Sequence, residues 1–279
     1  MTTSCCFHSN THNPRKRNFT NSKLPKHKIQ TKQRRFNFNK KKIIKQSTQI
    51  VQKPTNQQTL TQKNTVFTEV FFQRFEKIRN NPFRKRLRIL PKQKTSDEGK
   101  MTLCLDLDQT LIYGSFTPFR QMDFQSHVIG DPNKTIYVKK RPHLDDFLRQ
   151  CSKLFEVVIY TASDPRYADA IINKLDPNNE LISHRLYRQC CWPLSSVCYL
   201  KDLSILNRDI TKVILVDDSP ISFFLNPENG VEASPFIDDP LKLNQNKDSE
   251  LLRILKIVQT IEKSKNVFES FYVPKPSNF

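Results

Sequence analysis

The stretch LCLDLDQTLI, residues Leu103–Ile112, decides how the rest of the sequence is interpreted. It begins as a continuous apolar run, which is typical of a strand buried on both faces of a sheet. Asp106 and Asp108 follow two residues apart, so strand alternation points both carboxylates to the same side. A lone Asp-x-Asp pair is also what a solvated turn can contain, so the meaning of the pair depends on the neighbouring strands.

Two further apolar runs end in polar residues in the same way. The run LFEVVIYTAS at 154–163 delivers Thr161 and Ser163, and the run KVILVDDSP at 212–220 delivers Asp217 and Asp218. Because the carboxyl ends of parallel strands meet at one edge of a sheet, we expect these side chains to gather there.

Helical stretches lie between the apolar runs. We expect helices from Pro142 to Cys151, from Pro165 to Leu175 and from Ser249 to Lys263, with each proline as a first helical residue. Strands that alternate with helices predict an α/β domain with a mostly parallel sheet.

The residue types at this edge suit a phosphate. Four close carboxylates repel one another unless a cation offsets them, and Mg²⁺ prefers such oxygen ligands. One carboxylate can attack phosphorus to give an aspartyl-phosphate, and the second can protonate the leaving oxygen. Thr161 can hold a phosphate oxygen, and Lys201, from the segment YLKDL, can neutralise charge on the phosphoryl group.

Two other classes of protein are alternatives for a site of this kind. A response-regulator receiver domain also has an acidic cluster, a threonine and a lysine, but there the lysine comes last, whereas Lys201 precedes the acidic pair Asp217–Asp218. Nucleotide-binding proteins need glycine-rich loops; this chain has four glycines and neither GxGxxG nor GxxxxGK[ST].

The charge is unevenly distributed along the 279 residues. Residues 1–100 hold 25 Lys+Arg and 4 Asp+Glu, a net of +21, and the remaining 21 and 23 give 101–279 a net of −2. We expect a disordered basic tail over 1–64, a basic amphipathic helix and linker over 65–100, an α/β domain with the phosphate site over 101–270 and a C-terminal tail over 271–279.

Several roles are open for the basic part. Residues 1–64 suit a solvated tail, a nuclear-import or nucleic-acid-binding tail, or a mitochondrial presequence. The helical pattern that includes Phe67, Phe71 and Phe75 favours a face packed on a domain over a membrane or partner helix. No apolar run reaches the roughly 18–20 residues of a membrane span, and we expect a nuclear or cytoplasmic monomer.

The seven cysteines include no CxxC pair. Their odd number and their spacing favour neither a disulfide framework nor a zinc site. Cys104 and Cys151 lie in apolar context, and we expect both to be reduced core residues.

Several longer segments resemble a known family. LDLDQTL looks like the first motif of haloacid-dehalogenase-type phosphatases, and YVKKRPHLDDFL, VVIYTASDPRYAD, HRLYRQCC and YLKDLSILNRDITKVILVDDSPISF resemble its small C-terminal-domain phosphatases. Members dephosphorylate phosphoserine or phosphothreonine in proteins, notably the tail repeats of RNA polymerase II. The resemblance implies a haloacid-dehalogenase-like Rossmannoid fold, with a small β insertion after the first strand and no large cap.

The resemblance also implies roles for single residues. Asp106 would be the nucleophile and a metal ligand, and Asp108 the general acid/base that gives its backbone carbonyl to Mg²⁺. Asp218 would be the side-chain metal ligand, with Asp217 holding the lysine or a metal-bound water. Thr161 and Lys201 would bind phosphate. The residues expected near the substrate are Arg188, Phe116 and Ser163.

Departures from the family pattern are small. Gln109 stands where glutamate is usual, Asp218 often appears as asparagine, and the segment before Lys201 is one residue longer. The sequence therefore predicts a Mg²⁺-dependent protein serine/threonine phosphatase, with a phosphopeptide-binding scaffold as the alternative.

Overall fold

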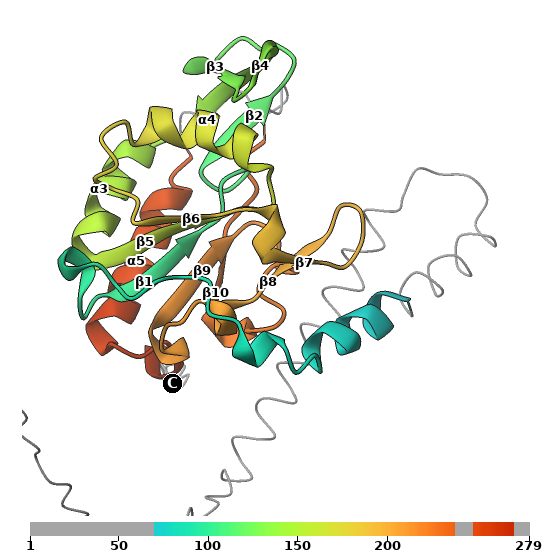
Figure 1. Cartoon of the computed structure of the whole chain (residues 1–279). Coiled ribbons are helices and arrows are strands. Elements are labelled where there is room, and N and C mark those ends of the chain that lie inside the picture. Colours follow the sequence, from blue (N-terminus) through green and yellow to red (C-terminus); the bar gives the residue numbers. More distant parts are fainter. Residues whose placement is uncertain (1–69, 238–247, 271–279) are drawn as a thin grey trace, which may run out of the picture. The chain divides into compact units, whose positions relative to one another are not determined.

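The structure is a computed structural model that describes residues 70–237 and 248–270. Its centre is a five-stranded parallel sheet with the strand order β10-β9-β1-β5-β6 (Figure 1). The predicted α/β architecture with a mostly parallel sheet is therefore confirmed. The strands are β1 (Met101–Leu105), β5 (Phe155–Tyr160), β6 (His184–Leu186), β9 (Val213–Asp217) and β10 (Gly230–Glu232).

The three long apolar runs of the sequence form the middle of this sheet. Cys104 of β1 lies opposite Leu215 of β9 on one side and Val158 of β5 on the other. Every residue of these three strands is buried. Because the strands are parallel, their carboxyl ends meet along one side of the sheet, called the carboxyl edge below, and their amino ends meet along the amino edge.

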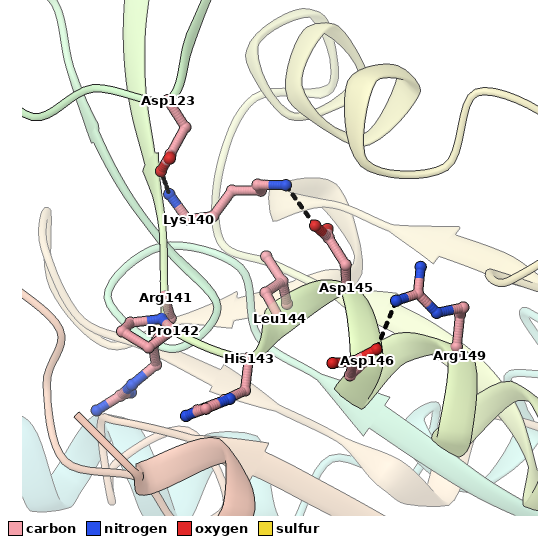
Figure 2. Close-up of a pocket in the computed structure, with 9 residues that line it drawn as sticks. All are labelled: Asp123, Lys140, Arg141, Pro142, His143, Leu144, Asp145, Asp146 and Arg149. Carbon is pink, nitrogen blue, oxygen red and sulfur yellow. Dashed lines mark hydrogen bonds and ion pairs between the residues drawn. The ribbon is translucent and has the colours of Figure 1, made fainter. Parts of the chain in front are cut away.

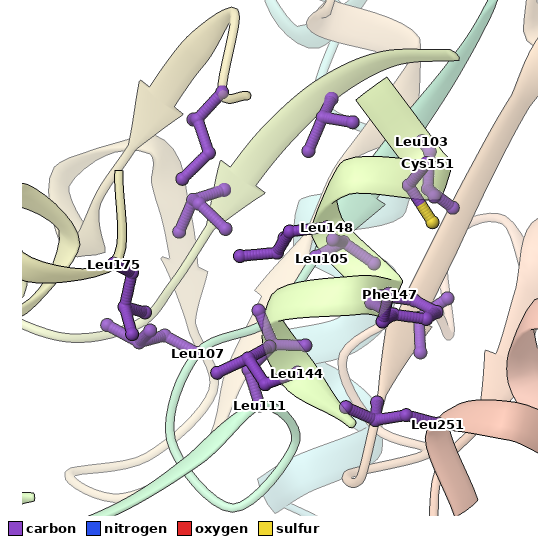
Figure 3. Close-up of a cluster of buried hydrophobic side chains, with 14 of the residues drawn as sticks. Leu103, Leu105, Leu107, Leu111, Leu144, Phe147, Leu148, Cys151, Leu175 and Leu251 are labelled. Atoms are coloured by element: carbon purple, nitrogen blue, oxygen red, sulfur yellow. The ribbon is translucent and has the colours of Figure 1, made fainter. Parts of the chain in front are cut away.

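The two faces of the sheet are covered differently within the described residues. Leu103 and Leu105 point to the face that carries α3 (Leu144–Leu154), α4 (Pro165–Leu175) and α5 (Glu250–Ser264), and they join the larger hydrophobic cluster (Figure 3). Cys104 points the other way and packs with Leu203 and Leu206. Burial on both faces explains why these strands read as continuous apolar runs.

The short helices are η1 (Arg84–Arg86), η2 (Thr95–Asp97), η3 (Arg188–Cys190), η4 (Leu203–Ile205), η5 (Ile210–Lys212), η6 (Pro227–Asn229) and α6 (Val267–Ser270).

Only one of the two prolines is a first helical residue. Helix α4 begins at Pro165, and the carboxylate of its N-cap Asp164 accepts from the backbone N–H of Arg166 at 2.9 Å. The prediction for Pro142 is wrong, because α3 begins two residues later. The intervening His143 has φ 70°, a left-handed conformation that a right-handed helix cannot contain.

Two antiparallel elements complete the fold. The strands β2 (Ile112–Ser115), β4 (Asp131–Lys140) and β3 (Phe124–Val128) form a small sheet directly after β1, where the β insertion is expected. A hairpin of β7 (Cys191–Pro193) and β8 (Tyr199–Lys201) precedes β9. No helix in the described ranges is long and apolar enough to span a bilayer.

The segment before β1 packs on the domain. A helix covers residues 70–79, and its Phe71 and Phe75 are buried, whereas Val70 is exposed. The Phe75 ring lies 4.8 Å from the ring of Phe224 between centroids. The described part of this helix therefore has the packed face that its periodicity predicts. Phe67 and the predicted tails over 1–64 and 271–279 lie outside the described residues.

The core cysteines are as expected. Cys104 and Cys151 are both buried and both free. Burial raises the pKa of each thiol well above its ordinary value, which keeps both groups protonated and unreactive.

Candidate active site

The carboxyl edge gathers acidic side chains around one lysine. Nζ of Lys201, at the end of β8, donates to Asp106 Oδ1 and to Asp217 Oδ2, both at 2.6 Å. Asp106 directly follows β1 and Asp217 ends β9, so the pairing of these two strands brings them together. All three residues are at most 7% exposed, so this is a buried charge cluster rather than a solvated turn.

Asp218 adds a third carboxylate to the cluster. The Thr110 hydroxyl donates to Asp218 Oδ1 at 3.3 Å and accepts from the Asp218 backbone N–H at 3.0 Å. Carboxylate oxygens of Asp106, Asp217 and Asp218 lie within 4.8 Å of one another. Three acids against one lysine leave surplus negative charge, and carboxylate oxygens are ligands that hard divalent cations prefer. These residues therefore fit a divalent metal ion.

The three acidic side chains differ in how many of their carboxylate oxygens accept hydrogen bonds. Asp217 uses both oxygens, accepting from Lys201 through Oδ2 and from the Ser219 backbone N–H through Oδ1 at 2.9 Å. Asp106 uses Oδ1 for Lys201, and Asp218 uses Oδ1 for Thr110. Asp106 and Asp218 thus each keep a second oxygen for a cation, while Asp217 is the residue that holds the lysine.

Burial and the neighbouring charges shift the pKa values of Asp217 and Asp218 upward. Burial, with the charge of Asp106, raises the pKa of Asp218 to about 6. Burial likewise raises the pKa of Asp217 to about 7, although Lys201 opposes the shift. Burial alone would lower the pKa of Lys201, but Asp106 and Asp217 outweigh it and raise that pKa. A site that disfavours its own carboxylate charges is prepared for added positive charge.

Asp108 faces a different set of partners. Ser163 Oγ donates to Asp108 Oδ2 at 2.7 Å, and the Tyr167 hydroxyl donates to Oδ1 at 2.6 Å. Burial raises the pKa of Asp108 despite these two hydrogen bonds, and Asp106 raises it further. A carboxyl group with a raised pKa, two residues from a second carboxylate, is suited to donate and accept a proton. In the described structure its side chain stands outside the three-carboxylate group.

The contact between Tyr167 and Asp108 was not predicted from the sequence. The hydroxyl of Tyr167 occupies the space beside Gly114 of β2, where an added Cβ would meet it at 2.2 Å. Only glycine leaves this space open. The available signal was the position of Tyr167 in the first turn of a helix that starts at Pro165, just beyond the carboxyl end of β5.

The remaining predicted residues lie around this centre. Thr161 directly follows β5 and is 1% exposed, and its hydroxyl accepts from the Ser163 backbone N–H at 3.0 Å. Arg188 is exposed and donates from Nε to the Ala162 carbonyl at 2.6 Å. The structure thus brings Arg188 to the 161–163 loop, and it turns the hydroxyl of Ser163 toward Asp108.

Phe116 belongs to the β insertion and stands over Tyr167. Its side chain is 50% exposed, and its ring lies 5.8 Å from the Tyr167 ring between centroids. The ammonium group of Lys134 lies 4.3 Å from the centre of the Phe116 ring. Phe116 contacts Tyr167, which in turn donates to Asp108. This exposed aromatic ring, with a cation beside it, is well placed to contact a bound peptide.

A pocket of about 360 Å³ lies to one side, between the end of β4 and the start of α3 (Figure 2). Its charges are already paired: Lys140 contacts Asp145, and Arg149 contacts Asp146. A binding site for a charged ligand is therefore not indicated here. The residues that line it are Asp123, Lys140, Arg141, Pro142, His143, Leu144, Asp145, Asp146 and Arg149.

The known proteins that this chain resembles are named as phosphatases. Residues 101–268 match the family described as NLI interacting factor-like phosphatase. The chain is 37% identical over 183 residues to the human carboxy-terminal domain RNA polymerase II polypeptide A small phosphatase 2, covering 65% of each protein. It is 38% identical over 174 residues to phosphatase PSR1 of Saccharomyces cerevisiae, covering 62% of this chain and 39% of that relative.

A solved structure is also similar in part. It is titled "The Structure of Fcp1, an essential RNA polymerase II CTD phosphatase", with 21% identity and a TM-score of 0.48, covering 59% of this chain and 63% of that one. The chain thus spans less than two thirds of the length of the two relatives and of this structure.

Proposed function

Because this chain belongs to the NLI interacting factor-like phosphatase family, we propose that it is a magnesium-dependent protein serine/threonine phosphatase acting through an aspartyl-phosphate. The observation that carries this proposal is the buried cluster of Asp106, Asp217 and Asp218 around Lys201. It combines a carboxylate nucleophile, a cation-binding group and a fixed ammonium charge at one edge of the sheet.

In the first step a carboxylate oxygen of Asp106 attacks the phosphorus atom. The bond from phosphorus to the seryl or threonyl oxygen breaks, and that oxygen takes the proton of Asp108. The raised pKa of Asp108 supports its being protonated when the substrate arrives. Lys201 offsets the negative charge that Asp106 and the phosphoryl group share.

In the second step water attacks the aspartyl-phosphate at phosphorus. Asp108, now a carboxylate, takes the proton of the water, and the bond to Asp106 breaks to release inorganic phosphate. Ser163 and Tyr167 hold Asp108 by hydrogen bonds through both steps. Asp106, Asp218 and the backbone carbonyl of Asp108 would hold Mg²⁺, which would supply positive charge to the phosphoryl oxygens.

The substrate in this proposal is a phosphorylated protein segment. The human relative is named for the carboxy-terminal domain of RNA polymerase II, which makes that domain the first substrate to test. Arg188 and Phe116 are the residues proposed to contact the segment, since both are exposed beside the cluster. Such a substrate and the basic clusters in residues 1–64 favour the nucleus as the compartment.

Phosphate release from phosphoserine, phosphothreonine and phosphotyrosine peptides tests the proposal. We expect turnover of the first two in Mg²⁺, none in chelator, and no inhibition by thiol-blocking reagents, because no cysteine takes part. Binding of the peptides without phosphate release in Mg²⁺ would instead identify a phosphopeptide-binding scaffold.

A further inference from the structure

The segment of residues 70–94, called the strap below, lies before the part of the chain that matches the family. It is nevertheless packed on the domain, because Phe75 is 1% exposed and Leu90 is 4% exposed. Leu90 joins the hydrophobic cluster on the face of the sheet that carries Cys104 and Leu203. The strap is therefore an integral layer of the fold rather than a linker.

Arg84 connects the strap to the active site. Its Nε donates to Asp202 Oδ2 at 2.5 Å, and its Nη2 donates to Asp202 Oδ1 at 3.0 Å. The Arg84 side chain is 10% exposed and the Asp202 side chain 0% exposed. A two-point pair of this kind fixes both direction and distance, which a lysine could not reproduce.

Asp202 is the neighbour of Lys201 in the chain. Its backbone N–H donates to the Tyr160 hydroxyl at 3.3 Å, and its carboxylate accepts from the Ser204 backbone N–H at 3.1 Å. Asp202 is thus held by three elements at once: the strap and η4 bind its carboxylate, and β5 binds its backbone N–H. Any shift of Asp202 would move the backbone from which the Lys201 ammonium reaches Asp106 and Asp217.

Other strap contacts reach the same region. Arg74 donates from Nη1 to the carbonyl of Leu194, in the loop between β7 and β8, at 3.1 Å. Phe75 packs on Phe224, and the carbonyl of the nearby Ser222 accepts from the Lys201 backbone N–H at 2.7 Å. A second set of Arg84 contacts anchors its far side, where Nη1 donates to the carbonyl of Arg79 at the end of the strap helix at 3.0 Å.

We propose that the strap positions Lys201 for phosphoryl transfer through the buried Arg84–Asp202 pair. Arg84 is then a positioning residue, since it reaches the reacting groups only through Asp202 and Lys201. The inference deepens the proposed phosphatase function and rests on it, and it makes residues 70–94 part of the catalytic domain. Removal of Arg84 leaves the Asp202 carboxylate buried without its cation, so the loop is expected to move.

The test compares Arg84→Gln with Arg86→Ala in the full chain, because Arg86 is an exposed residue two positions away. We expect Arg84→Gln to lower kcat by about 10- to 100-fold with an unchanged KM, as a misplaced catalytic group does. Arg86→Ala should keep the wild-type kcat. In a Lys201→Ala background, Arg84→Gln should cause no further loss, because the two residues act through one group. Equal kcat for Arg84→Gln and wild type, or full additivity, would overturn the inference.

Hydrogen exchange gives a readout that does not need activity. In Arg84→Gln, the amides of residues 199–206 should exchange faster, while those of β3 and β4 should not change. If Arg84→Gln does not fold, Arg84→Lys replaces it, and it should show the same local change in a smaller amount. Unchanged exchange at residues 199–206 would contradict the strap's role, even if the wild type released no phosphate. Faster exchange at these residues, together with an inactive wild type, would reject only the proposed phosphatase function.

Discussion

Acidic side chains are buried at both edges of the central sheet, but their pKa values shift in opposite directions. At the amino edge, Glu156 is 0% exposed and accepts from Thr102 Oγ1 at 2.7 Å and from Arg208 Nε at 2.8 Å. Burial would raise the pKa of Glu156, but the hydrogen bonds from Arg208 and its neighbours lower it well below its ordinary value. At the carboxyl edge, the acids share one lysine, and the pKa values of Asp217 and Asp218 are raised.

The difference separates a structural charge from a functional one. The amino edge supplies a cation for its buried acid, so its network stabilises the fold as built. The carboxyl edge sets one lysine against three carboxylates, so its network costs stability until a ligand brings more positive charge. Buried acids alone therefore do not mark a site; acids in excess of their cations do.

The largest expected effect is on catalysis at the carboxyl edge. Asp108→Asn should lower kcat/KM on a phosphoserine peptide by about 10²–10⁴-fold, because the amide cannot deliver a proton to a poor leaving group. The kcat/KM for an aryl phosphate, whose good leaving group needs no proton, should fall much less. Asp146→Asn, an exposed acid on α3, is the control and should keep the wild-type rate. Equal losses of kcat/KM on both substrates would argue against proton transfer from Asp108 to the leaving oxygen.

At the amino edge the largest effect should be on stability. Glu156→Gln should lower the free energy of unfolding by about 3–5 kcal/mol, because it leaves the guanidinium of Arg208 buried without its partner. Urea unfolding measures this change. The matched substitution Glu76→Gln removes an exposed pair with Arg79 and should cost less than about 1 kcal/mol. A comparable loss in both variants would show that the amino edge is not a special network.

Added Mg²⁺ should stabilise the wild-type protein, since the cation supplies the charge that the carboxyl edge lacks. A metal concentration of about 100 times the dissociation constant corresponds to about 2.7 kcal/mol. Asp218→Ala removes a ligand oxygen and should lose most of this gain, whereas Glu76→Gln should retain it. Thermal unfolding with MgCl₂ and with chelator provides the comparison, and an equal gain in Asp218→Ala would exclude Asp218 as a ligand.

The smallest expected effect is a pH dependence with opposite signs at the two edges. Folding raises the pKa of Asp218 from 3.8 to about 6, so in chelator its contribution is fully present below pH 3.8 and is lost as the pH rises through about 6. The wild type should therefore lose about 1–3 kcal/mol between pH 5 and pH 8, and Asp218→Asn should show a flatter curve. Glu156 has a lowered pKa, so its contribution is lost only as the pH falls below 4.5. Equal slopes in the wild type and in Asp218→Asn would reject the assignment to Asp218.

Much of the carboxyl edge was predictable because short stretches of sequence determine it. Three apolar runs end in polar residues, and parallel pairing then brings Asp106, Thr161 and Asp217 to one edge. The start of α4 at Pro165 followed from equally local rules. These features need no knowledge of distant contacts, which is why the fold class agrees with its prediction and these three residues lie at one edge.

Contacts between distant residues could not be predicted in the same way. The Arg84–Asp202 pair joins residues 118 positions apart, and a basic residue in a basic segment carries no sign of such a partner. The contact between Tyr167 and Asp108 depends on the space that Gly114 leaves. The left-handed conformation of His143, which delays α3, likewise has no local signal as clear as a glycine.

The most direct test of the account is to trap the covalent intermediate. A peptide carrying radiolabelled phosphoserine is mixed with excess enzyme in Mg²⁺, and the reaction is stopped with acid within one turnover. We expect label on the wild-type protein that hydroxylamine removes, and no label on Asp106→Asn, whose turnover should fall by about 1,000-fold or more. Labelling or wild-type turnover in Asp106→Asn would contradict the claim that the crowded carboxyl edge exists to make Asp106 attack phosphorus.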